Sequence, residues 1–97
     1  MNIQELLQLN EKERLLKFVQ LIAELEQTVC DHLLSSDKSK LGIIEKLAHF
    51  EVMMSLMVSK GDIDINFVHQ NVMAIFEQNK NHLPEPLKQV SHLYRVK

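Results

Sequence analysis

Apolar residues recur along most of this chain at the three- and four-residue spacing of one face of a helix. The pattern predicts a short helical segment near Ile3–Leu9, a long helix over residues 11–34, and shorter helices over about 39–59, 64–80 and 84–95. Asn10 and Glu13 have the spacing of a capping box, which favours a helix start just after Asn10. We therefore predict an all-α fold, a compact bundle of about four helices with a long N-terminal helix, in a single domain over residues 1–97 that dimerisation would complete.

Polar segments rich in capping residues separate the predicted helices. The segment SSDKSK covers residues 35–40, and NKNHLPEP covers residues 79–86. Both read as loops. Pro84 suits the first position of the last helix, because its missing N–H is not needed there.

The stretch KGDIDINF, residues 60–67, resembles the opening of a calcium loop. It places acidic and amide side chains at alternate positions: Asp62, Asp64 and Asn66. A calcium loop also needs Gly at its sixth position and Glu at its twelfth, where this chain has Phe67 and Met73. We therefore interpret the stretch as a helix boundary, with Gly61 ending one helix in a left-handed conformation and Asp62 or Asp64 capping the next.

The long helix carries more apolar surface than one contact needs. Its polar residues form a single stripe: Lys17, Gln20, Glu24, Gln27, Thr28 and Asp31. Nearly all other positions are apolar, so the helix is either central in its own bundle or shared with a second chain. Glu26 breaks this pattern, because it lies opposite the polar stripe, and a carboxylate there needs a partner, a proton or access to solvent.

The second long helix has two apolar faces. The face that we expect to point inward comprises Ile43, Leu47, Phe50, Met54, Met57 and Val58. The nearly opposite face comprises Leu41, Ala48, Val52 and Leu56. Large uncovered apolar patches usually mark association, so we predict that this second face is an interface. The alternative is that the first or last helix of the chain covers it.

Composition and charge narrow the class of protein. Apolar residues make up 45% and charged residues 25% of the 97 residues, which is typical of a globular protein rather than a disordered one. The net charge of −2 gives no general attraction to nucleic acid or to an anionic membrane, and we expect neither as a partner. Cys30 is the single cysteine, and the first residues lack a secretory pattern, so we expect a cytoplasmic protein.

Candidate residues for chemistry are few. The sequence contains no His-x-x-x-His, Glu-x-x-His or Cys-x-x-Cys motif, and we predict no metal site, no cofactor and no catalytic residue. Glu45 and His49 are one turn apart on one helical face, and with Glu26 they form the candidate polar site. The hypothesis that follows is a non-enzymatic protein-binding module, an adaptor, regulator or inhibitor that forms a homodimer. The alternative is a small bundle that binds a ligand or a metal.

Overall fold

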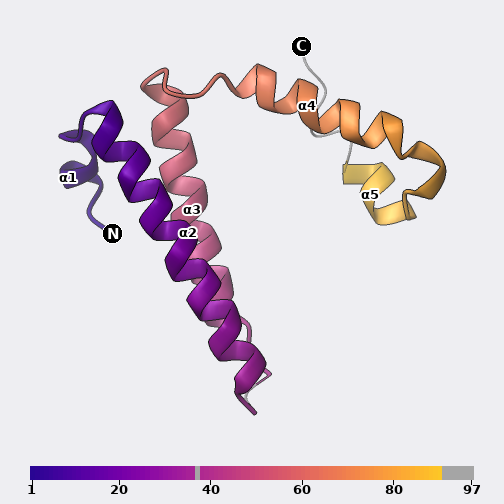
Figure 1. Ribbon diagram of the computed structural model, residues 1–97, viewed down its shortest axis with the longest axis horizontal. Helices are drawn as coiled ribbons and strands as arrows, with labels where there is room; N and C mark the ends of the chain where they lie inside the picture. Colours follow the sequence, from indigo (N-terminus) through magenta and orange to yellow (C-terminus); the bar gives the residue numbers. More distant parts are fainter. Residues whose placement is uncertain (37, 91–97) are drawn as a thin grey trace. The chain divides into compact units, whose positions relative to one another are not determined.

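Helices account for most of the chain in the computed structural model, which describes residues 1–36 and 38–90. The order of elements is α1 (Ile3–Leu7), α2 (Glu11–Leu34), α3 (Leu41–Ser59), α4 (Ile65–Gln78), a 3-10 turn (Lys80–His82) and α5 (Glu85–Val90). The described residues contain no strand, and the predicted all-α fold with a long N-terminal helix is confirmed (Figure 1). The predicted end of the last helix, residues 91–95, lies outside the described residues.

The capping box predicted from the sequence opens α2. The backbone N–H of Glu13 donates to the side chain of Asn10 at 2.9 Å, and the backbone N–H of Asn10 donates to the Glu13 carboxylate at 3.0 Å. These two bonds satisfy N–H groups that have no partner inside the helix. The start of α2 is therefore fixed by local chemistry.

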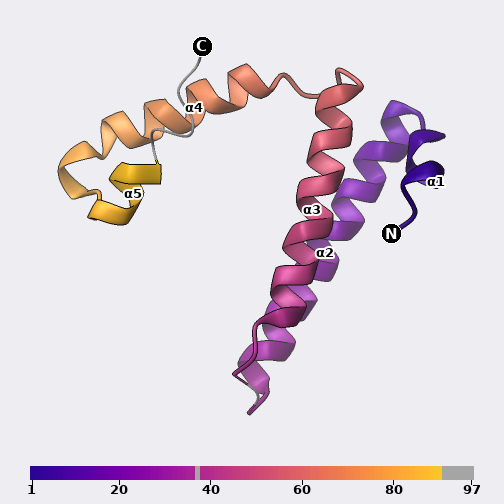
Figure 2. The ribbon, with the colours of Figure 1, turned by 180° about the vertical axis from the view of Figure 1, so that it is seen from behind.

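Contacts divide the chain into two compact units, the first spanning Met1–Asp62 and the second beginning at Ile63. In the first unit, α2 and α3 lie side by side along their length (Figures 1 and 2). They run antiparallel, because Arg14 of α2 contacts Asp62 beyond the end of α3, while Thr28 lies near Gly42 at the start of α3. The first unit is thus a helical hairpin with α1 packed beside it.

The buried apolar side chains of the described residues are Leu6, Leu21, Met53 and Met57, and all four lie in the first unit. The rings of Phe18 and Phe50 add a contact between α2 and α3, with centroids 4.8 Å apart. The unbranched methionine side chain adapts to irregular spaces, which suits the centre of a small interhelical core.

The inward face of α3 agrees with the predicted one only in part, since Met57 is buried and Phe50 contacts Phe18 as expected. The structure buries Met53 and Met57 completely, whereas Leu47 remains 45% exposed and Met54 is half-buried. Apolar residues surround nearly the whole of α3, so their spacing alone does not determine which side meets α2. The expectation that Leu47 points into the core was wrong.

In the second unit, α4 begins after Asp64, whose side chain accepts a hydrogen bond from the Asn66 N–H at 2.9 Å. This confirms one of the two capping residues that we predicted. Pro84 precedes α5 instead of opening it, and its carbonyl accepts the first backbone bonds of that helix from Leu87 and Lys88. None of the side chains described in this unit is buried. The prediction of a single domain over residues 1–97 stays a prediction.

Gly61 ends α3 as expected, with a φ of 80°. Its N–H donates to the carbonyl of Val58 at 3.0 Å, and the next N–H, of Asp62, donates to the carbonyl of Met57 at 2.9 Å. This pair of bonds defines a Schellman motif, in which the left-handed residue turns the chain sharply away from the helix. The turn therefore determines the position of Asp62, whose side chain contacts Arg14.

We predict that Gly61→Ala destabilises the protein by about 1 kcal/mol, because a Cβ makes the left-handed conformation costly. No atom lies within 4 Å of a Cβ built at Gly61, so the loss would come from backbone strain alone. Urea denaturation followed by circular dichroism measures the change.

The matched control is Gly42→Ala within α3. A Cβ there would meet the Thr28 methyl group at 3.5 Å, an ordinary contact, and alanine favours a helix. Gly42→Ala should leave stability unchanged or raise it. Equal losses at both glycines would contradict this explanation of the turn.

Candidate functional site

Arg14 connects three segments of the first unit. It lies in the first turn of α2, and its Nε and Nη2 donate to the two carboxylate oxygens of Asp62 at 2.5 and 2.7 Å. Its Nη1 donates to the backbone carbonyl of Leu9, in the link between α1 and α2. The planar guanidinium group matches a carboxylate in this two-bond geometry, which gives the contact a defined orientation.

The ion pair is shielded from water. The Arg14 side chain is 10% exposed and that of Asp62 is 3% exposed. The hydrogen bond from Arg14 lowers the pKa of Asp62, and the attraction of Arg14 and Lys60 adds to it, while burial opposes both. The same hydrogen bond raises the pKa of Arg14. Asp62 therefore favours its charged form in the folded chain.

This ion pair was missed by the sequence analysis, which assigned Asp62 only a capping role. A signal was present, because Arg14 stands four residues before Phe18 and seven before Leu21, on the face of α2 that meets α3. A cation on a core face needs an acidic partner. The sequence did not specify which of the acidic residues would supply it.

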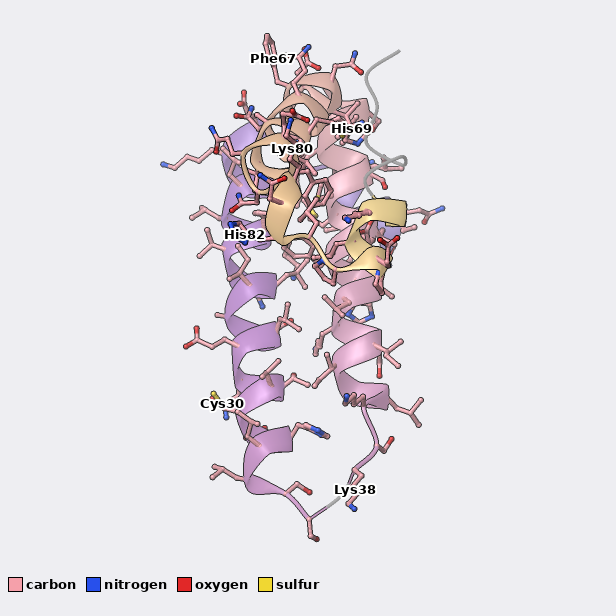
Figure 3. The ribbon with its side chains drawn as sticks, turned by 90° about the vertical axis from the view of Figure 1, so that its right-hand side faces the viewer. Cys30, Lys38, Phe67, His69, Lys80 and His82 are labelled. Atoms are coloured by element: carbon pink, nitrogen blue, oxygen red, sulfur yellow. The ribbon has the colours of Figure 1, made fainter. Side chains whose placement is uncertain are left out.

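The outer side of α2 is a broad apolar surface. Its large side chains are exposed by the following fractions: Leu15 43%, Leu16 59%, Val19 60%, Ile22 44%, Leu33 75% and Leu34 89%. We call this set the outer face of α2. Figure 3 shows Cys30, which the structure exposes, on the side of α2 turned away from α3. The sequence had indicated that α2 has more apolar surface than one neighbour can cover.

The four residues predicted as an interface on α3 are found in different surroundings. Leu41 is 73% exposed, Ala48 is exposed, Val52 is 37% exposed and Leu56 is half-buried. The structure brings Val52 and Leu56 together with Ile3 of α1 along a shallow groove, which does not include Leu41 or Ala48. Their role as an interface stays a prediction.

The three residues of the candidate polar site do not converge. Glu26 on α2 and Glu45 on α3 are exposed, whereas His49 is half-buried. His49 borders a pocket of about 400 Å³ between α1, α2 and α3, which neither Glu26 nor Glu45 lines. The pocket has a floor of Leu6 and Leu21 and a charged rim, where Lys46 pairs with Glu24 at 3.5 Å.

Over residues 1–36 and 38–90, no group of three or more His, Cys, Asp or Glu side chains is placed to hold a metal ion. Within the same residues, no helix combines the length and the apolar character required to cross a membrane.

Comparisons with models of protein families, with curated proteins and with solved structures found no match to this chain.

We predict that Asp62→Asn lowers the melting temperature by several degrees at pH 7, because it leaves the Arg14 charge shielded and unpaired. The control is Asp64→Asn two residues later, which should be nearly neutral because Asn caps a helix as well as Asp does. Circular dichroism during heating measures both variants. Equal behaviour of the two variants would contradict the role of the ion pair.

The same pair predicts a dependence of stability on pH. Because the pKa of Asp62 is lowered by folding, its stabilising contribution is fully present above the unfolded value, about 4, and is lost as the pH falls through the lower folded value. Arg14 stays charged throughout this range. The difference in unfolding free energy between wild type and Asp62→Asn should therefore shrink below about pH 4.

Proposed function

We propose that this protein is a binding module that acts on another protein as an adaptor, regulator or inhibitor, and that it self-associates. The proposal rests on the outer face of α2. Six large apolar side chains on this face are between 43% and 89% exposed, whereas only four apolar side chains are buried in all the described residues. Contiguous apolar surface of this kind is uncommon on proteins that act alone and marks a site of association.

The geometry of α2 supports binding through a preformed surface. The helix is capped at its start, and the Arg14–Asp62 pair and the buried core hold it against α3. A helix fixed in this way presents its outer side chains without a large loss of conformational freedom on binding. Amphipathic helices commonly meet other helices or grooves through side chains spaced as Leu15, Val19 and Ile22 are.

Binding rather than catalysis is the proposed activity, in the cytoplasm. The single Cys30 is free and exposed, which suits a reducing compartment. A second proposed contact surface on the same unit comprises four α3 residues: Leu41, Ala48, Val52 and Leu56.

A small ligand is the second candidate partner, and the pocket lined by His49 favours it. Its apolar floor and its charged rim combine the two kinds of surface typical of ligand sites. Native mass spectrometry of the purified protein tests this function, because a retained small molecule would add a fixed mass.

We predict that Val19→Glu abolishes complexes formed through the outer face while leaving the fold intact, because Val19 is 60% exposed. The matched control is Gln27→Glu, which adds the same charge on the polar stripe of α2. Complexes are measured by crosslinking in native cells followed by mass spectrometry, and folding by circular dichroism. Retention of every wild-type complex by a folded Val19→Glu variant would contradict the proposed function.

A further inference from the structure

Two charges flank the first half of the outer face of α2 and are placed symmetrically about Val19. Lys12 precedes Val19 by seven residues and Glu26 follows it by seven. Seven residues make nearly two helical turns, so all three side chains lie on one line along the helix. Between the two charges the same side carries Leu15, Leu16, Val19, Ile22 and Ala23. The surface is therefore an apolar strip about 21 Å long, with a cation at one end and an anion at the other.

Both end charges are available for an intermolecular contact. Lys12 and Glu26 are exposed, and neither forms an ion pair with another residue in the part of the chain that the structure describes. Glu26 lies opposite the polar stripe, and the sequence offered no reason for a charge at that position. A partner with a cation at this point would form an ion pair with the Glu26 carboxylate.

We propose that a second copy of this chain occupies the part of the outer face between Lys12 and Glu26, with the two α2 helices antiparallel about a two-fold axis at Val19. The proposal rests on the proposed function and names its partner. In this arrangement Lys12 of each chain meets Glu26 of the other, because the two residues lie equally far from the two-fold axis on opposite sides of it. On one flank of this line Leu15 meets Ile22 of the other chain, on the other flank Leu16 meets Ala23, and Val19 meets its own copy.

Charge selects this arrangement over a parallel one. A parallel pair in register would place Glu26 against Glu26 and Lys12 against Lys12, and like charges across an interface are strongly unfavourable. The antiparallel pair replaces both repulsions with attractions. One helical face of this length makes a small interface, so we expect a dissociation constant on the order of micromolar.

Charge reversal tests the pairing by sedimentation equilibrium of the full chain between about 1 and 500 μM, a range chosen around a micromolar dissociation constant. Lys12→Glu and Glu26→Lys should each weaken the dimer by about tenfold or more, because each creates two repulsive contacts. The double variant that carries both changes restores opposite charges and should return to within about threefold of wild type. A double variant no tighter than the single variants overturns the proposal.

Cysteine crosslinking tests the direction of the helices. Cys30 is eleven residues from the axis, so the two copies of Cys30 would lie about 33 Å apart and form no disulfide under mild oxidation. Val19→Cys combined with Cys30→Ser places a single cysteine at the axis, where it should crosslink to its own copy. Crosslinking through native Cys30 would indicate parallel helices. Absence of a crosslink between the two cysteines at position 19 would exclude a two-fold axis at Val19. Either result overturns the proposal.

Failure of the dimer and failure of the proposed function give different results. If the wild type is a monomer at every concentration, the two-fold arrangement is wrong. The binding function would still be supported if the Val19→Glu variant no longer forms a complex that the wild type forms with a different protein. If Val19→Glu remains folded and loses neither the dimer nor another partner, both are wrong.

Discussion

The contact between Arg14 and Asp62 is the constraint on which the first unit depends. It joins the first turn of α2 to the turn that follows α3, and Arg14 also binds the Leu9 carbonyl in the link from α1. Once Arg14 faces α3, the helical period determines which side chains of α2 point outward. Arg14 lies on the same packed side of the longest helix as Phe18 and Leu21, and the apolar residues opposite are exposed.

Backbone geometry and electrostatics act together at this contact. The left-handed Gly61 turns the chain, and the Asp62 N–H closes the motif on the Met57 carbonyl while the Asp62 side chain binds Arg14. A shielded charge that loses its partner is costly, so such a pair disfavours any shift of α3 along α2 that would separate its members. Burial of the apolar side chains Leu21, Met53 and Met57 supplies attraction but discriminates less between neighbouring alignments.

Local signals in the sequence predicted the helices well, because caps and turns depend on residues close together in the chain. Asn10 and Glu13 predicted the start of α2, Gly61 the end of α3, and Asp64 the start of α4. Features that depend on long-range packing were less accessible. Leu47 was wrongly included in the inward face of α3, because apolar residues surround that helix. The sequence did not identify Asp62, 48 positions away, as the partner of Arg14. Excess apolar surface on α2 could be recognised, whereas its actual exposure required the neighbouring helices.

The uneven distribution of buried residues along the hairpin has a consequence for its motions. Leu21, Met53, Met57 and the Arg14 side chain are buried toward one end, whereas Leu33, Leu34 and Leu41 are exposed next to the loop at the other. Regions with few buried contacts open at lower free energy than the regions around a core. Amide hydrogens of α2 near residues 29–34 should therefore exchange with solvent through local opening, and those near Leu21 should exchange only when the whole hairpin unfolds. The hairpin would then unfold progressively, from the end that carries the loop toward the end that carries the ion pair.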